Sequence, residues 1–145
     1  MRCIRAVVAS LALLCGAPIA AHAAQLTIGN AWFRALPGGL PAGGYFVLRN
    51  VGGHEAVLTG ARSPACGMLM LHKSTQESGM DRMEMVDSVA VPAKGDVRFA
   101  PGGLHLMCTE PGPEMTPGGR IAVTFEFADG TKLSASFRVK NARGQ

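Results

Sequence analysis

The sequence predicts an all-β protein, built as an antiparallel sandwich or barrel. Glycine (19 residues) and proline (9 residues) are frequent, and they interrupt the chain about every ten positions, as turns between short strands do. No stretch keeps the apolar period of an α-helix. The runs between the turns alternate or are rich in β-branched and aromatic residues. Short strands at regular spacing are typical of an antiparallel sandwich or barrel.

The expected strands follow one another from residue 44 to residue 139. The clearest runs are residues 44–49, 67–72, 96–99, 104–107, 121–127 and 132–139. The last two are joined by a segment that contains Asp129-Gly130, a pair that favours a tight hairpin turn. Residues 140–145 are expected to form a short frayed tail. The chain has no internal repeat and no linker long enough to divide it, so one domain is expected.

The first 23 residues have the three parts of a secretory signal peptide. Residues 1–5 are short and basic, residues 6–20 are apolar and uncharged, and residues 21–23 supply the small residues that signal peptidase requires. The apolar run is too short for a convincing membrane span. We therefore expect residues 1–23 to be removed on export to the periplasm. Residues 24–145 are then the folded domain, without stable membrane insertion.

A lipoprotein anchor is the alternative interpretation of this first segment. Cys15 would be the residue that carries the lipid. However, Leu13 and Leu14 precede it at positions where a small residue is expected. The cleaved signal is therefore the preferred interpretation.

Charge and motifs argue against nucleic-acid binding and against catalysis. The formal net charge is +4, and without Arg2 and Arg5 the chain keeps 12 basic against 10 acidic residues, or +2. The basic residues are scattered, without the clusters and interleaved aromatic residues of a nucleic-acid surface. The sequence has no Gly-x-Ser-x-Gly, His-Glu-x-x-His or paired-acid motif. We therefore expect no nucleic-acid partner and no enzymatic activity.

Two cysteines remain beyond the signal, Cys66 and Cys108. They lack the C-x-x-C spacing of a redox motif, and pairs of cysteines in exported proteins are commonly disulfides. A disulfide is therefore favoured over two free thiols. Cys108 follows Met107 directly, so the two side chains should face opposite sides of one strand.

Methionine is abundant beyond the signal. The seven residues are Met68, Met70, Met80, Met83, Met85, Met107 and Met115. Met68, Met70 and Met115 are interpreted as core residues that fill gaps where aromatic side chains are scarce. Residues 79–85 are too polar for a buried strand, so some of their methionines are expected near the surface.

Histidine is scarce, and one histidine shares a face with a methionine. His54 lies in a turn-like stretch and is expected to be a solvated loop residue. In residues 104–107, strand alternation puts the two leucines on one face and His105 and Met107 on the other. Thioether sulfur is a soft, neutral ligand that selects Cu(I) in preference to zinc, and imidazole adds a nitrogen donor. A single histidine is more often structural, so the pair is unusual but the case for a metal site depends on the spacing of histidine with methionine.

A longer spacing pattern includes this pair. His72, Met83, His105 and Met107 stand in the order His-x10-Met-x21-His-x-Met. This order resembles the signature of the periplasmic copper chaperone family called PCu(A)C. The similar flanking segments are residues 30–35, residues 43–50 and the Pro-Gly-Gly turn of residues 101–107. The resemblance extends over nearly the whole chain beyond the signal.

The resemblance implies a cupredoxin-like antiparallel β-sandwich that acts as a copper chaperone. It implies that one Cu(I) ion is held by His72, Met83, His105 and Met107. Met80 and Met85 are close enough in sequence to take the place of Met83. It also implies delivery of copper to the CuA centre of cytochrome c oxidase, with a Sco-type thiol protein and oxidase subunit II as partners. Some relatives carry a C-terminal extension rich in His and Met for further copper. Neither residue type follows Met115 here, which argues against a second, Cu(II)-preferring site.

Three other functions are alternatives to a copper chaperone. A copper-sequestering or tolerance protein would use the same ligands without a dedicated oxidase acceptor. A blue-copper electron-transfer protein needs a Cys thiolate with two His, whereas Leu106 and Met107 follow His105. A plain immunoglobulin-like adhesion module with incidental methionines would bind no metal.

Overall fold

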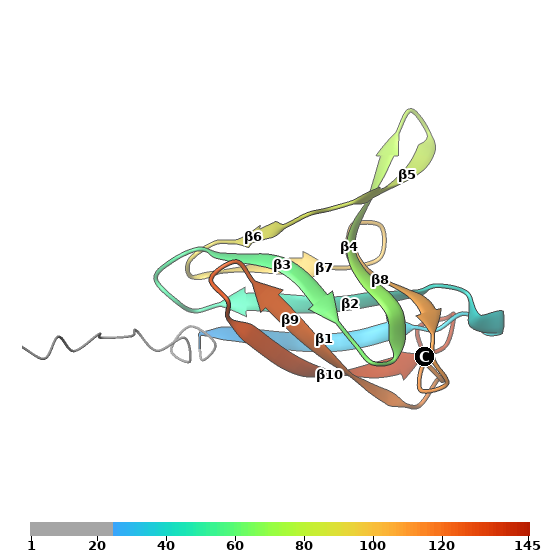
Figure 1. The fold of residues 1–145 in the computed structure, drawn as a ribbon. Helices are drawn as coiled ribbons and strands as arrows, with labels where there is room; N and C mark the ends of the chain where they lie inside the picture. The colour runs from blue at the N-terminus through green and yellow to red at the C-terminus, as the bar shows by residue number, and fades with distance from the viewer. Residues whose placement is uncertain (1–24) are drawn as a thin grey trace, which may run out of the picture.

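The computed structural model of the protein describes residues 25–145. Within them the chain forms ten β-strands and one short 3-10 turn, η1 (Pro37–Gly39), without an α-helix (Figure 1). No helix in this part of the chain has the length and apolar character needed to cross a membrane. The predicted all-β class is confirmed, whereas the predicted signal at residues 1–23 lies outside the described residues.

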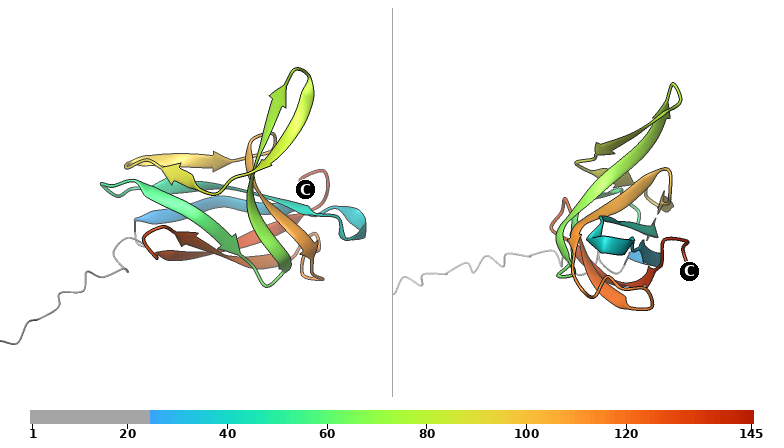
Figure 2. Two further views of the ribbon diagram at one scale, coloured as in Figure 1. Left: turned by 45° about the horizontal axis from the view of Figure 1, so that its top comes forward. Right: turned by 90° about the vertical axis from the view of Figure 1, so that its right-hand side faces the viewer.

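The strands include every run expected from the sequence and several more. Their bounds are β1 Leu26–Arg34, β2 Ala42–Asn50, β3 Ala56–Arg62, β4 Cys66–Glu77, β5 Met80–Met85, β6 Val89–Val91, β7 Gly95–Phe99, β8 Leu104–Pro111, β9 Arg120–Phe127 and β10 Lys132–Lys140. β4 is the longest of them, and it continues beyond the body of the fold into the hairpin that it forms with β5 (Figures 1 and 2).

All ten strands belong to one hydrogen-bonded sheet that curls over on itself (Figure 2). The order across it is β5-β4-β8-β2-β1-β10-β9-β3-β6, and β7 also pairs with β2. Residues 42–44 of β2 pair with β8, whereas residues 46–50 pair with β7. Each pair is antiparallel except β1 with β10, which run parallel. β8 is therefore held between β2 and β4 in the middle of this end of the sheet.

The core lies between the two halves of the curled sheet and is centred on phenylalanine. All six phenylalanines are buried, at 4% exposure or less. Phe46 of β2 is the central one, with ring centroids 4.2 Å from Phe99, 4.9 Å from Phe125 and 5.7 Å from Phe137. Each buried phenylalanine contributes about 1.5–3 kcal/mol of hydrophobic free energy. These contacts join strands from both halves of the sheet.

Alternation along each strand sends one set of side chains to this core and the other set to the outer face. In β8, Leu106 and Cys108 are fully buried and Leu104 packs against the core. His105 and Met107 therefore point to the opposite, outer face. The expected division of residues 104–107 between two faces is confirmed.

The predicted hairpin between β9 and β10 is confirmed. Gly130 adopts a positive φ of 84°, a conformation that glycine reaches at little cost. The Phe127 amide donates to the Thr131 carbonyl at 3.0 Å, and the Thr131 amide donates to Asp129 Oδ1 at 2.9 Å. Asp129 and Gly130 therefore form the turn that the sequence predicts, the first through its side-chain hydrogen bond and the second through its positive φ.

The expectation of a frayed C-terminal tail is wrong. Residues 141–145 form a compact turn in which the Asn141 side chain accepts hydrogen bonds from the amides of Arg143 and Gln145, at 3.0 and 3.1 Å. The Asn141 amide also donates to the Gln145 carbonyl at 2.9 Å. A single asparagine that bonds to its own following backbone orders this segment.

The favoured disulfide is present between Cys66 of β4 and Cys108 of β8, with a Cα–Cα separation of 5.4 Å. The two strands are also hydrogen-bonded neighbours from Cys66–Pro111 to Lys73–Leu104. The disulfide thus links the two strands that carry His72 and His105, and its Cys108 end is buried in the core.

Candidate metal centre

The register of β4 against β8 brings the two histidines of the pattern together. His72 is the direct cross-strand partner of His105. Residues directly opposite one another in an antiparallel pair point to the same face. Their ring centroids are 5.7 Å apart at an interplanar angle of 70°. They are 33 positions apart in sequence, so this proximity depends on strand pairing.

Met107 and Met83 reach the same outer face from two other positions. Met107 lies two residues beyond His105 on β8 and is paired with Gly43 of β2 on one side. Met83 comes from β5, where it is the partner of Ser74. Met83, His105 and Met107 line one pocket of about 310 Å³. His72 does not line it but stands against the His105 ring. The structure therefore gathers all four predicted residues on one face.

The pocket has a polar rim that the sequence had not indicated. Its lining consists of Arg34, Leu36, Pro41, Gly43, Tyr45, Ser74, Met83, Pro101, Gly102, His105 and Met107. Arg34 Nη2 donates to the Tyr45 hydroxyl at 2.9 Å. A Cβ atom on Gly43 would lie 2.6 Å from the Tyr45 hydroxyl oxygen. Because glycine has no side chain, the Tyr45 hydroxyl can lie over Gly43, next to Met107.

Hydrogen bonding fixes how His105 presents its ring. Its Nδ1 lies 3.0 Å from the Gly103 carbonyl oxygen, which can only accept, so Nδ1 carries the proton and donates. Nε2 is then the atom with the free lone pair. A backbone carbonyl in this position is the usual orienting partner of a metal-binding histidine. His105 is also 5% exposed, so its ring is held in place by its surroundings.

His72 carries a buried nitrogen without a partner. Within the described residues, its Nδ1 is buried and has no hydrogen-bond partner. Such an atom costs free energy unless it is satisfied. Burial, together with the neighbouring His105, lowers the pKa of His72 below 6.5. The ring is thus neutral at pH 7, which is the form that can donate a lone pair to a metal.

The donor set selects a soft ion. Residues 25–145 contain no group of three or more His, Cys, Asp and Glu side chains that could hold a metal. Hard-cation sites and the usual zinc sites are built from these types. Both cysteines of the described residues are bonded to each other, which removes the thiolate of a blue-copper site. What remains is two imidazoles and two thioethers, a set that fits Cu(I).

Several further methionines lie near this face, and two of them correct the sequence interpretation. Met68 is 59% exposed and Met70 is partly exposed, so the prediction that they belong to the core is wrong. Met115 is 7% exposed, as predicted for it. Met68 and Met70 alternate in step with His72, so counting by two from His72 places them on its face.

The remaining methionines of β5 differ in position. Met85 is the direct partner of His72 and is 67% exposed, so it stands beside the site. Met80 is 66% exposed and pairs with Glu77 at the hairpin end. Its spacing from Met83 puts it on the other face of β5. His54 is exposed in the loop after β2, as expected.

Fold and site together define a class, an all-β domain with a soft-donor cluster of histidine and methionine on its outer face. Comparison of the sequence with known families agrees with it. The family described as "Putative lipoprotein LpqE-like" matches residues 26–139, and the chain belongs to this family.

Curated relatives extend the match. "Putative lipoprotein Lxx21020" of Leifsonia xyli subsp. xyli is 30% identical over 118 residues, which are 81% of this chain and 70% of that protein. "Uncharacterized protein RP573" of Rickettsia prowazekii is 28% identical over 98 residues, 67% of this chain and 54% of that protein.

Solved structures confirm the resemblance to the PCu(A)C family and its cupredoxin-like fold. The solution structure of CuI-DR1885 from Deinococcus radiodurans is 28% identical, with a TM-score of 0.64 over 79% of this chain and 76% of that one. The copper-bound PCuAC domain from PmoF2 is 23% identical, with a TM-score of 0.66 over 81% of this chain and 93% of that one. The second likeness concerns the fold alone.

Proposed function

We propose that the protein binds one Cu(I) ion through His72, Met83, His105 and Met107 and passes it on as a copper chaperone. The observation that carries this proposal is the meeting of two imidazoles and two thioethers on one face, with a buried His72 nitrogen that has no hydrogen-bond partner among residues 25–145. The family membership and the copper(I)-bound relative from Deinococcus radiodurans support it.

The four ligands suit an ion that must be released again. All of them are neutral, so the loaded site carries a net charge of only +1 at a partly apolar surface. His105 is buried and anchored, whereas Met83 is 55% exposed on the edge strand β5. An incoming thiol or imidazole can therefore approach the ion from the side of Met83 and replace it first. The histidine pair, held by strand pairing, keeps the ion in place until the new bond forms.

The destination that we propose is the CuA centre of cytochrome c oxidase, with a Sco-type thiol protein and oxidase subunit II as partners in the periplasm. This part depends on the family resemblance, and the lipoprotein names of relatives support an exported protein. A sequestering protein would use the same ligands. The two roles differ in whether the ion moves to an acceptor on mixing.

Competition with a chromophoric Cu(I) chelator tests the binding step. Wild type should withdraw one equivalent of Cu(I), and Met83→Leu and His105→Ala should each weaken binding by about tenfold or more, the effect of losing about 1.4 kcal/mol of ligand bonding. Met80→Leu is the matched control because Met80 is also exposed on the same strand but its side chain points to the opposite face. Unchanged affinity in Met83→Leu or His105→Ala would remove that residue from the site.

Transfer to an acceptor tests the role. Copper-loaded protein mixed with a reduced, metal-free Sco-type protein should lose its Cu(I) in a bimolecular reaction. Retention of the ion at equilibrium, with binding intact, would favour sequestration over delivery.

A further inference from the structure

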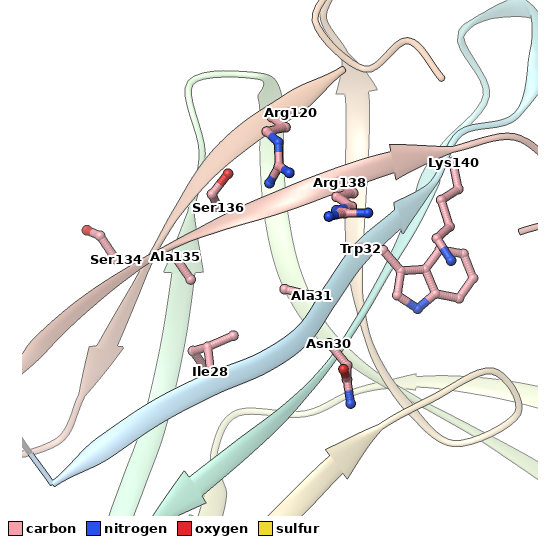
Figure 3. A pocket seen from close by; sticks show the side chains of 10 residues that line it. All are labelled: Ile28, Asn30, Ala31, Trp32, Arg120, Ser134, Ala135, Ser136, Arg138 and Lys140. Atoms are coloured by element: carbon pink, nitrogen blue, oxygen red, sulfur yellow. The ribbon is translucent and has the colours of Figure 1, made fainter. Parts of the chain in front are cut away.

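A cationic groove lies over β1, β9 and β10 (Figure 3). Its Trp32 is the direct cross-strand partner of Tyr45, which lines the candidate metal pocket, so groove and pocket share one face of the sheet. It has a volume of about 760 Å³, and ten residues line it. Three of them are cations, Arg120, Arg138 and Lys140, and none is acidic. Lys140 Nζ lies 4.8 Å from the centre of the Trp32 ring. The groove thus combines positive charge with an aromatic wall.

Two of these cations face one another across neighbouring strands. Arg120 of β9 and Arg138 of β10 are direct cross-strand partners, and both are exposed. Like charges directly opposite in a sheet destabilise it. A matched pair of opposite charges would have stabilised the same position. The repulsion is relieved when an anion lies between the two guanidinium groups.

No aspartate or glutamate side chain of the described residues supplies that relief. Within residues 25–145, Arg120, Arg138 and Lys140 form no ion pair. Glu126 shares the face of Arg120, but it lies six residues further along β9 and is paired with Arg62 at 3.2 Å. The adjoining groove near the start of β1 adds Arg49 and Arg98 against the single acid Asp96, so the positive surface continues in that direction.

Contacts between side chains connect the groove to the metal pocket. Lys140 stacks on Trp32, and the Trp32 and Tyr45 rings are 4.8 Å apart. Tyr45 in turn carries the Arg34 guanidinium 5.3 Å from its ring centre. Tyr45 and Arg34 both line the pocket of Met83, His105 and Met107. A ligand bound in the groove therefore lies next to the edge of the metal site.

We propose that this cationic face docks the acidic surface of a protein partner, with carboxylates seated on Arg120, Arg138 and Lys140. A planar guanidinium binds a carboxylate through two parallel hydrogen bonds, which neither lysine nor a neutral side chain can do. That the partner is the acceptor of the copper ion depends on the proposed function. The docking surface itself does not.

A protein fits the groove better than a membrane does. A membrane-binding face usually adds exposed apolar side chains that enter the lipid. In the described residues the exposed large hydrophobic side chains are Leu36, Leu40, Val51, Met68, Met80, Met83 and Met85, and none of them lines the groove. The groove is concave, polar and bordered by an aromatic ring, so it matches a protruding acidic loop.

Trp32 is the single tryptophan of the chain, so its fluorescence reports directly on this groove. Metal-free protein is titrated at low salt with a ten-residue polyglutamate peptide, which stands for the acidic surface, and with the polyglutamine peptide of equal length. Polyglutamate should change the Trp32 emission in a saturable manner, and raised salt should weaken the binding because exposed charges are screened within about 10 Å at 0.1 M. Polyglutamine should have no effect.

Charge-matched variants locate the binding. Arg120→Gln/Arg138→Gln should weaken polyglutamate binding by about tenfold or more, since it removes two charge-assisted contacts. Lys73→Gln/Lys94→Gln removes the same charge from exposed positions outside the groove and should weaken it by less than about threefold, the contribution of general attraction. Equal losses in both double variants, or no saturable change in Trp32 emission, would overturn the proposal.

Two further arms separate this proposal from its rivals. Binding to phosphatidylglycerol vesicles without binding to polyglutamate would identify a membrane as the partner and overturn the protein surface. Cu(I) affinity is measured on Arg120→Gln/Arg138→Gln as well and should equal that of wild type. If the wild-type protein bound no copper but bound polyglutamate in the groove, the proposed function would fail while the docking surface stood. The reverse result would overturn the docking surface alone.

Discussion

Breaking the Cys66–Cys108 bond should lower the stability of the domain by a predictable amount. The bond closes a loop between residues 42 positions apart. For a loop of this length, the loss of chain entropy in the unfolded state gives a stabilisation of about 4 kcal/mol at 25 °C. Reduction of the wild-type protein is the cleanest perturbation because both side chains stay in place. Cys108 is fully buried, so its replacement by alanine would add a cavity.

Urea unfolding of the oxidised and reduced protein measures this difference. With a slope of about 1.5 kcal/mol/M, a loss of about 4 kcal/mol moves the midpoint down by about 2.7 M. Cys66→Ala/Cys108→Ala should lose at least as much. A loss below about 1 kcal/mol on reduction would refute the reasoning. The β4–β8 register does not depend on the bond alone, so the folded double variant should still bind one Cu(I).

Other outcomes follow from the core and from His72. Gly44→Ala should destabilise the fold by about 1–3 kcal/mol through overpacking, because its Cβ would lie 2.7 Å from the Phe33 ring and 3.0 Å from Leu106 Cβ. Gly53→Ala, which meets no atom within 4 Å, should stay within about 0.5 kcal/mol of wild type in the same urea assay. Since folding lowers the pKa of His72 below 6.5, the unfolded chain takes up this proton at higher pH than the folded one. Stability is therefore full above pH 6.5 and falls as the pH drops through the window below it. His72→Gln should flatten this part of the profile, and an unchanged profile would contradict the assignment. Cu(I) affinity should change little between pH 7 and 8 and weaken only below 6.5, and affinity that stayed constant to pH 5 would rule out imidazole ligands.

Patterns among neighbouring residues were sufficient to predict much of this molecule. Short runs between frequent turn residues predicted the all-β class, and the Asp129-Gly130 pair predicted the β9–β10 hairpin. Side-chain alternation predicted that His105 and Met107 face outward. The opposition of His72 to His105 and the parallel pairing of β1 with β10 depend on long-range register. Local patterns do not contain that register, and only the family spacing connected His72 and Met83 to the site.

The predictions that were wrong or incomplete have identifiable structural causes. The apolar character of Met68 and Met70 predicts core positions, whereas their alternation with His72 puts them on the outer face. The order of residues 141–145 comes from one asparagine side chain that bonds to the backbone after it. Tyr45 and Arg34 reached the pocket through packing over Gly43 and a hydrogen bond across two strands. No sequence motif predicts such contacts.

X-ray absorption at the copper K-edge of the Cu(I)-loaded protein tests the central claim most directly. The two histidines and two methionines predict an edge shape of Cu(I) and a first shell of two nitrogen and two sulfur atoms. Met83→Leu should reduce the sulfur count to one, whereas Met80→Leu should leave it at two. A shell of nitrogen and oxygen alone, or a sulfur count that Met83→Leu does not change, would contradict the site described for this protein.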